Sequence, residues 1–346
     1  MTQLADYTTL GLGGPAKTFV TAASEAELSA AVSAADAAGE PVLLLGGGSN
    51  LVIADDGFDG TVIHVVTRGL RFTDAGGPLT DVTAAAGEPW DDVVARCVDA
   101  GLAGLECLSG IPGSVGATPI QNVGAYGQEV AEVITRVRVI DRRTGTTLDI
   151  PNGSCRFSYR NSLFKSGEPG RYVVTDVTFR LRAEELSRPV RYAELAAELG
   201  VETGERAPVA KIRSGVLAVR GRKGMVLDPG DPDTRSAGSF FTNPVLSREQ
   251  LAHVEAAADG PVPRFDAGPG LVKVPAAWLI EHAGFAKGHG APGPARVSSK
   301  HTLALANAGG ATTADLLALA REIVAGVRDA FGVTLTPEPT LIGVTL

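Results

Sequence analysis

The chain has 346 residues, of which 44% are hydrophobic and 20% are charged, enough for about two or three domains with buried cores. Its 31 Lys and Arg against 39 Asp and Glu give a formal net charge of −8, which disfavours a broad nucleic-acid-binding or anionic-membrane surface. No apolar run approaches the ~20 residues that a membrane span needs. The N-terminal residues lack the basic and apolar regions of a signal peptide, so we expect a cytoplasmic protein.

The three cysteines, Cys97, Cys107 and Cys155, are odd in number and widely spaced, which suits neither a disulfide framework nor a zinc site. We therefore expect no metal site. Glycine occurs 43 times, whereas aromatic residues make up only 5%. Such a composition can reflect genome base composition, or it can mean that the backbone approaches a ligand closely. Clustering of the glycines decides between the two.

Helices and strands are predicted throughout the chain. Ser24 and Glu27 precede a helical apolar face and predict a helix start, and the run 42–45 predicts a buried strand. Further strands are expected at 61–66, 81–86, 134–150 and 171–182, and further helices at 89–100, 207–219, 247–258, 275–284 and 313–331. The charged segment 182–191 is a candidate connection between domains. This mixture predicts an α+β or mixed α/β class.

The first glycine cluster is the sequence GGGSN at 46–50, directly after the buried strand. Consecutive glycines allow positive φ and let several backbone N–H groups point into one concavity, which suits phosphate oxygens. A tight turn is the alternative interpretation. The loop is not a Walker A motif, because no Gly-Lys-Ser/Thr follows, and no G-x-G-x-x-G sequence opens a helix here.

The second glycine cluster lies in the segment 104–127, which shows little periodicity and is longer than most loops inside a domain. Two glycine-lined loops far apart in the sequence suit a ligand with a pyrophosphate and two ends, such as a dinucleotide. Because the Rossmann fingerprint is missing, FAD in another α+β fold is favoured over NAD in a Rossmann fold.

Three polar residues, Arg160, Ser239 and Glu338, stand in apolar, glycine-rich or proline-flanked settings. Ser239 is not a G-x-S-x-G nucleophile, since Phe241 occupies the last glycine position. For Arg160 and Glu338, a plain salt bridge is the alternative to a catalytic role.

Five motifs together carry a family resemblance. They are GGGSNLVI at 46–53, SGIPGSVGATPIQNVGAYG at 109–127, YRNSLFK at 159–165, AGSFFTNP at 237–244 and PEPTLIG at 337–343. In this order, and over nearly the whole chain, they resemble the UDP-N-acetylenolpyruvoylglucosamine reductase (UDP-N-acetylmuramate dehydrogenase) family. The resemblance implies an α+β fold: a vanillyl-alcohol-oxidase/PCMH-type FAD-binding domain in two parts and a C-terminal α+β substrate-binding domain. The implied boundaries are 1–70 and 71–205 for the two FAD-binding parts, with 333–346 returning to the second, and 206–332 for the substrate-binding domain.

The activity that this resemblance implies is the NADPH-dependent, FAD-mediated reduction of the enolpyruvyl group of UDP-N-acetyl-3-O-(1-carboxyvinyl)-glucosamine. Its product is UDP-N-acetylmuramate, a peptidoglycan precursor. FAD would be bound non-covalently and NADPH would be the co-substrate. We expect a monomer that binds neither nucleic acid nor membrane.

The resemblance also assigns site residues. The catalytic set is Arg160, Ser239 and Glu338. Flavin contacts fall on Gly46, Gly47, Gly48, Ser49, Asn50, Leu51, Gly110, Ile111, Pro112, Gly113, Ser114, Gly116, Ala117, Gln121, Asn122, Gly124, Val174 and Arg220. Substrate contacts fall on Tyr126, Tyr159, Tyr192, Lys223, Asn243 and His301. Residues 191–195 resemble the longer form of the family, which has a substrate-closing tyrosine loop. The sequence departs from the family pattern at Pro339-Thr340.

The implied chemistry needs two kinds of group. Hydride adds to the terminal carbon of the double bond, so negative charge builds on the neighbouring carbon and its carboxylate; fixed positive charge and a proton donor are then required. Arg160 suits the carboxylate because guanidinium is planar and always charged, and Ser239 suits the proton transfer. Glu338 either orients Arg160 or stabilises the protonated enol.

Two rival functions remain at this point. One is an oxidase or dehydrogenase of the same flavin fold acting on a small alcohol; the additional C-terminal domain disfavours it, as does Ser49, because such oxidases often tether FAD through a histidine in that region. The other is a non-catalytic nucleotide-binding regulator. An absorbance spectrum separates these functions: bound flavin disfavours the regulator, and bleaching of that flavin by NADPH favours the reductase over the alcohol oxidase.

Overall fold

The computed structural model describes residues 1–346, which form two compact units. The central unit comprises residues 16–47 and 59–226, and the C-terminal unit comprises residues 1–15, 48–58 and 227–346. The first glycine cluster therefore contributes residues to both units. The three-part domain division implied by the resemblance stays a prediction.

The central unit begins with a small sheet and a covering helix. The strands β1 (Ala16–Ala22), β4 (Phe58–Val65) and β2 (Val42–Leu45) lie in the order β1-β4-β2, and β2 runs parallel to β4. Helix α1 (Glu25–Ala37) begins where predicted, because the Glu27 N–H donates to the Ser24 hydroxyl at 3.2 Å. Its apolar face, with Leu28 and Val32, packs in one cluster with Ile63 of the small sheet and Ile140 of a larger one.

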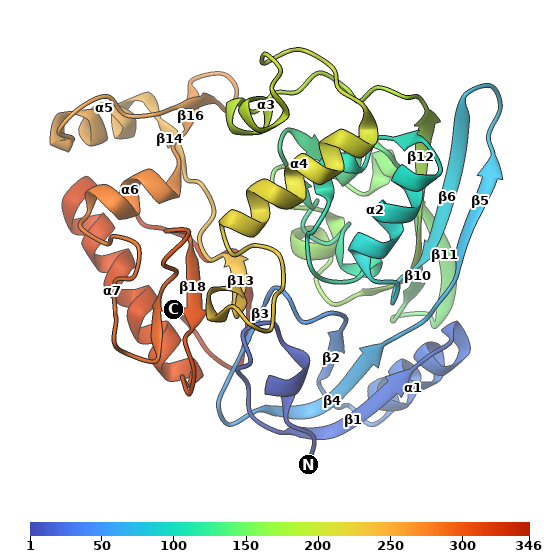
Figure 1. Cartoon of the computed structure of the whole chain (residues 1–346). Helices are drawn as coiled ribbons and strands as arrows, with labels where there is room; N and C mark the ends of the chain where they lie inside the picture. The colour runs from blue at the N-terminus through green and yellow to red at the C-terminus, as the bar shows by residue number, and fades with distance from the viewer. The chain divides into compact units, whose positions relative to one another are not determined.

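That larger sheet is antiparallel and has six strands (Figure 1). Its main path is β11-β10-β12-β6-β5, and β7 pairs with β12. The strands are β5 (Leu70–Asp74), β6 (Leu79–Ala85), β7 (Leu102–Ala103), β10 (Ile134–Asp141), β11 (Thr146–Pro151) and β12 (Tyr172–Ala183). Helix α2 (Trp90–Asp99) buries its apolar face on this sheet, where the Trp90 and Phe179 rings lie 5.7 Å apart. Cys97 is buried in the same core.

The remaining elements of the central unit are short strands and two helices. A hairpin of β8 (Gly124–Ala125) and β9 (Gln128–Glu129) ends the second glycine-rich segment. Helices α3 (Ala193–Leu199) and α4 (Val209–Arg222) pack together around Leu195, Leu199 and Ile212. The charged segment that we expected to connect domains leads from β12 to α3 and stays inside this unit.

The C-terminal unit contains three small sheets and three helices (Figure 1). The sheets are β13 (Ser236–Ser239) with β18 (Ala304–Asn307) and β17 (Ala295–Val297); β14 (Val245–Ser247) with β16 (Leu271–Lys273) and β15 (Phe265–Asp266); and β3 (Leu51–Ile53) parallel to β19 (Thr340–Ile342). Helices α5 (Arg248–Ala257), α6 (Ala276–His282) and α7 (Thr313–Phe331) lie within two residues of the predicted bounds. A capping box of Thr312 and Asp315 begins α7.

All three cysteines are free and buried. None of the helices combines the length and the apolar character that crossing a membrane requires.

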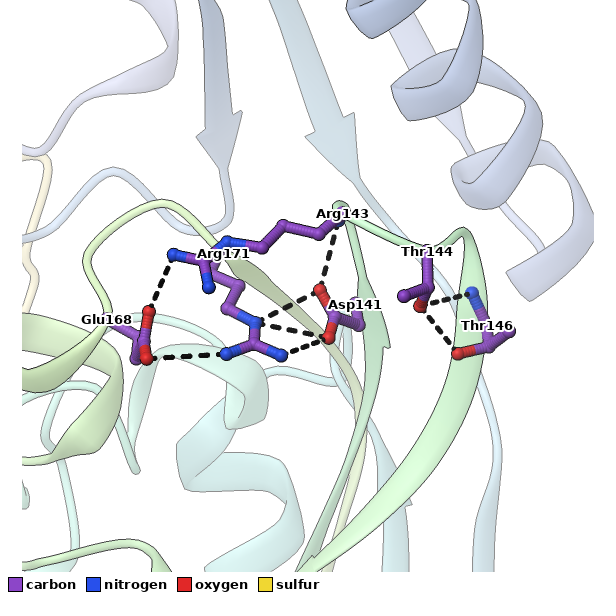
Figure 2. A network of polar contacts seen from close by, with 6 residues as sticks. All are labelled: Asp141, Arg143, Thr144, Thr146, Glu168 and Arg171. Carbon is purple, nitrogen blue, oxygen red and sulfur yellow. Dashed lines mark hydrogen bonds and ion pairs between the residues drawn. The ribbon is translucent and has the colours of Figure 1, made fainter.

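A network of charged residues connects the C-terminal end of β10 to the residues that precede β12 (Figure 2). The buried Asp141 carboxylate accepts hydrogen bonds from Arg171 Nη2 at 2.6 Å and from the Arg143 backbone N–H at 3.0 Å. Glu168 bridges the two arginines, at 2.9 Å from Arg143 Nη2 and 3.3 Å from Arg171 Nη1. Because the hydrogen bonds from Arg171 favour the charged form, they lower the pKa of Asp141 below its ordinary value.

We predict that Asp141→Asn lowers the thermal unfolding midpoint at pH 7 by several degrees, since Arg171 then keeps only its longer contact with the Glu168 carboxylate. The folded-state pKa of Asp141 is the lower one, so its stabilisation is present above the unfolded value of about 3.9 and is lost as the pH falls below it. The gap between wild type and variant should therefore shrink between pH 7 and pH 3 in thermal melts. Asp99→Asn, an exposed change at the end of α2, is the control. An equal gap at both pH values would contradict this account.

Candidate active site

The two glycine-rich loops, far apart in the sequence, touch each other within the central unit. A Cβ atom added to Gly46 would lie 2.2 Å from the Ser114 hydroxyl oxygen. One added to Gly47 would lie 2.7 Å from the Gly113 Cα. Both distances are shorter than real Cβ contacts. The Ser114 hydroxyl could rotate away, but the Gly113 backbone could not, so only glycine at position 47 permits this approach of the two backbones.

The start of α2 holds the second loop in place. The Gly113 carbonyl accepts the Trp90 backbone N–H at 3.0 Å, and the Val115 N–H donates to the Glu88 carbonyl at 2.9 Å. The Trp90 indole N–H also donates to the Leu108 carbonyl at 3.0 Å. These bonds fix the loop on both sides of its Ile-Pro-Gly-Ser segment.

Five backbone N–H groups at this meeting point have no acceptor in the chain. They belong to Ile111, Gly113 and Ser114 in the second loop and to Gly46 and Gly47 in the first. Several backbone N–H groups that converge without acceptors in the chain can form an anion site. The pair of loops therefore fits the diphosphate of a dinucleotide such as FAD.

An arginine adds positive charge beside this cradle. Arg220, near the end of α4, has a buried Nε atom with no hydrogen-bond partner, while its Nη2 donates to the Met225 carbonyl at 2.8 Å. A Cβ on Gly110 would lie 3.5 Å from Arg220 Nε. Burial lowers the pKa of Arg220, so its guanidinium, too, would be stabilised by an anion bound at the loop.

The Arg160 side chain is hydrogen-bonded to the end of the second loop. It adopts φ +53°, in the left-handed region that side chains rarely take. Its Nη2 donates to the Gly124 carbonyl at 2.9 Å and its Nη1 to the Asn122 carbonyl at 3.4 Å. The neighbouring Tyr159 ring lies 5.7 Å from the guanidinium carbon. The backbone strain and the carbonyl contacts together set the direction of this side chain.

Asn122 connects the second glycine-rich loop to the turn that contains Arg160. Its side chain is buried and donates to Glu129 Oε2 at 2.7 Å and to the Ser158 carbonyl at 3.1 Å, and it accepts the Ala131 N–H at 3.1 Å. The side-chain amide of Asn122 therefore uses its Nδ2 as a donor and its Oδ1 as an acceptor within the protein. The side chain of Val174, another expected flavin contact, is buried in the core of the large sheet.

In the C-terminal unit, Ser239, Glu338 and Asn50 lie together. The Glu338 N–H donates to the Phe240 carbonyl at 2.8 Å, which places Glu338 beside Ser239, and the Asn50 amide donates to the Glu338 carbonyl at 3.4 Å. The register of β13 shifts between Ser236 and Ser239, with Gly238 at φ +71° between them. Such a bulge redirects the side chain that follows it.

Three expected substrate residues also gather, all of them in the central unit. The rings of Tyr126 and Tyr192 are 5.9 Å apart, edge to face. Lys223, just after α4, forms an ion pair with Glu194 of α3. Burial raises the pKa of Tyr126 to about 12, so its hydroxyl stays neutral at ordinary pH.

Asn243 and His301 belong to the C-terminal unit. The side-chain Oδ1 of Asn243 accepts the Ala276 backbone N–H at 2.9 Å, at the first residue of α6. His301 lies in the turn before β18, where its N–H donates to the Ser298 hydroxyl at 3.3 Å.

The expected site residues thus divide between the two units. The central unit holds Gly46, Gly47, Gly110, Ile111, Pro112, Gly113, Ser114, Gly116, Ala117, Gln121, Asn122, Gly124, Tyr126, Tyr159, Arg160, Val174, Tyr192, Arg220 and Lys223; the C-terminal unit holds Gly48, Ser49, Asn50, Leu51, Ser239, Asn243, His301 and Glu338.

Sequence reasoning missed the residues that hold the second loop. Glu88 and Trp90 do so through the bonds described above, and Asp91 accepts the Gly110 N–H at 2.6 Å. The only sequence signal is an acid in the first turn of the helix at 89–100, which is common in helices of any function.

Comparisons with known proteins show the family of the chain. Residues 16–151 match an FAD binding domain family, and residues 231–342 match the C-terminal domain of UDP-N-acetylenolpyruvoylglucosamine reductase. The chain is 57% identical to the UDP-N-acetylenolpyruvoylglucosamine reductase of Thermobifida fusca, over 99% of this chain and 97% of that one. It is 59% identical to that of Streptomyces coelicolor, over 99% and 90%. The crystal structure of the Thermus caldophilus reductase is similar, with a TM-score of 0.66 and 26% identity over 99% of this chain and 97% of that one.

The FAD binding domain, the anion cradle and the C-terminal domain define an FAD-dependent oxidoreductase of the α+β class, with the PCMH-type flavin domain that we expected. With relatives this similar over their full length, the chain belongs to the UDP-N-acetylenolpyruvoylglucosamine reductase family.

We predict that Gly47→Ala weakens FAD binding by at least about tenfold and destabilises the protein by about 1–3 kcal/mol, because the new Cβ would meet the Gly113 backbone. Titration of apoprotein with FAD, followed by flavin fluorescence, and thermal melts measure the two effects. Gly153→Ala is the matched control, since a Cβ there meets nothing within 4 Å and its φ is unstrained. Unchanged FAD affinity in Gly47→Ala would show that the loop contact is not needed.

Proposed function

We propose that this protein reduces UDP-N-acetyl-3-O-(1-carboxyvinyl)-glucosamine to UDP-N-acetylmuramate with NADPH. The observation that carries the proposal is the 57–59% identity to UDP-N-acetylenolpyruvoylglucosamine reductases over nearly the whole chain. FAD held by the two glycine-rich loops would supply the hydride chemistry, with NADPH as the source and the terminal carbon of the enolpyruvyl double bond as the acceptor. The residues of the chain then have to stabilise charge and supply a proton.

Arg160 is proposed to bind the carboxylate of the substrate. A planar guanidinium makes paired contacts with a carboxylate and stays charged. Support comes from its two contacts with the loop carbonyls of Asn122 and Gly124, which orient the side chain before substrate arrives. The neighbouring Tyr159 is proposed as a further substrate contact.

Ser239 is proposed to give its hydroxyl proton to the substrate carbon next to the carboxylate, after hydride has reached the terminal carbon. Its place directly after the bulge in β13 supports a fixed orientation. Glu338, held beside it through the Phe240 carbonyl, is proposed to orient Arg160 or to stabilise the protonated enol.

The UDP part of the substrate is assigned to Tyr126, Tyr192, Lys223, Asn243 and His301. The first three lie near one another, in the second loop, directly before α3 and directly after α4, which supports a common role. Tyr192 is about half exposed and directly precedes α3, consistent with the longer form of the family.

FAD is proposed to be bound without a covalent link. Residues 46–50 offer no histidine or cysteine, and Cys107 makes a poor nucleophile because burial raises the pKa of its thiol. Denatured holoenzyme should release its yellow colour through a filter. We also propose a monomer that acts in the cytoplasm.

Anaerobic reduction tests the proposed activity directly. NADPH should bleach the flavin absorbance of the holoenzyme, and the enolpyruvyl substrate, added afterwards, should restore it with formation of UDP-N-acetylmuramate. Bleaching of the oxidised flavin by a small alcohol in place of NADPH, or no bleaching by either, would favour one of the rival functions.

We predict that Arg160→Lys loses about 10²–10³ in turnover, because an ammonium group cannot make the paired contact with a carboxylate. Steady-state kinetics with the enolpyruvyl substrate measure the loss. Arg156→Lys is the matched control: Arg156 lies in the same turn, also with positive φ, and its side chain is exposed. Near-normal turnover of Arg160→Lys would remove this arginine from the mechanism.

We predict that Ser239→Ala separates the two half-reactions. Stopped-flow should show flavin bleaching by NADPH near the normal rate, because the hydroxyl acts only on the substrate carbon. Reoxidation by the enolpyruvyl substrate should slow by several orders of magnitude, beyond the ~10²–10⁴ typical of one acid–base group. Equal slowing of both steps would make Ser239 structural, and slowing of neither would point to Glu338 as the proton donor.

A further inference from the structure

The carboxylate of Asp91 has two different tasks in the central unit. Its Oδ1 accepts the Gly110 N–H at 2.6 Å, at the start of the second glycine loop. The same carboxylate pairs with Arg213 of α4, at 2.6 Å from Nη1 to Oδ1 and 2.9 Å from Nη2 to Oδ2. It thereby ties the loop to both α2 and α4.

The bond to Gly110 determines what the rest of the loop can offer. Gly110 adopts φ +69°, and its N–H is already used by Asp91. The next N–H groups along the chain, those of Ile111, Gly113 and Ser114, are the ones left without acceptors. Without the carboxylate, the Gly110 N–H would need another acceptor, and the chain would have to rotate to find one.

The ion pair with Arg213 is a separate contribution. The Asp91 side chain is about one-third exposed and the Arg213 side chain about one-fifth, so the pair contributes to the packing of α4 against α2. Burial opposes the charge on Asp91, but the hydrogen bonds from Arg213 and Gly110 outweigh it and lower the pKa of the carboxyl group. The carboxylate is therefore ionised at neutral pH and accepts all three bonds.

We propose that Asp91 is a positioning residue for FAD: its Oδ1, by holding the Gly110 N–H, keeps the N–H groups of residues 111–114 in the arrangement that binds the dinucleotide. The ion pair with Arg213 contributes to the stability of the fold, and the hydrogen bond to Gly110 contributes to the affinity for FAD. The inference rests on FAD as the ligand of the two loops, which wild-type titration checks independently.

Two substitutions at Asp91 separate the two tasks. Asp91→Asn keeps an oxygen for Gly110 but loses the charge that pairs with Arg213, whereas Asp91→Ala loses both. Both should lower the unfolding midpoint of the apoprotein. Only Asp91→Ala should raise the Kd for FAD, by about tenfold, the effect of one lost hydrogen bond with a stranded partner; Asp91→Asn should stay within about threefold of wild type.

Asp81 supplies a matched control within the same unit. It forms a two-bond pair with Arg180 across β6 and β12, at 2.8 and 2.9 Å, and neither bond involves a loop N–H. Asp81→Ala should lower the unfolding midpoint and leave the Kd for FAD unchanged.

Arg213→Met keeps the test decisive if Asp91→Ala does not fold. It breaks the same ion pair and leaves the Gly110 contact, so the Kd for FAD should stay near that of wild type. Equal Kd values in Asp91→Asn and Asp91→Ala, an unchanged Kd in Asp91→Ala, or a tenfold rise in Arg213→Met would each overturn the proposal. Failure of the wild-type apoprotein to bind FAD would instead overturn the cofactor on which it rests.

Discussion

The contact between Gly47 and Gly113 is the constraint on which the cofactor site depends. Two backbones from distant parts of the sequence approach so closely that no Cβ fits between them. This approach brings the N–H groups of both loops to one place without consuming them in hydrogen bonds to each other. The fold thus leaves several backbone donors that an anion bound between the loops can use.

The surrounding structure compensates for the irregular backbone of these loops. The start of α2 binds the second loop on both sides of its free N–H groups. The buried amide of Asn122 then connects the far end of the loop to the turn that carries Arg160. Through these links, the loop residues that fit the cofactor and the arginine proposed to hold the substrate carboxylate belong to one connected scaffold.

Much of this fold could be predicted from local patterns. The cap at Ser24, the capping box at Thr312 and the apolar run at 42–45 are signals contained within a few residues, and α1, α7 and β2 lie where these signals place them. Elements that depend on distant partners were harder to predict. Helix α3 has only seven residues, follows a charged segment and is stabilised by packing on α4.

The candidate site shows the same difference between local sequence signals and contacts with distant residues. Glycine clusters and motif order predicted two loops as the cofactor site, and the structure brings these loops into contact. The roles of Asp91 and Asn122 were not visible, since each arises from a hydrogen bond to a backbone group elsewhere in the fold. The left-handed backbone of Arg160 was equally hidden, because its support comes from the carbonyls of residues 122 and 124.

Amide hydrogen exchange with and without FAD tests the central claim most directly. Without FAD, the N–H groups of Gly46, Gly47, Ile111, Gly113 and Ser114 have no acceptor and should exchange fast. Saturating FAD should slow exchange in both loops together and leave the glycine turn at 76–77, where a Cβ would meet nothing, unchanged. Bound FAD that protects neither loop, or only one of them, would contradict the account.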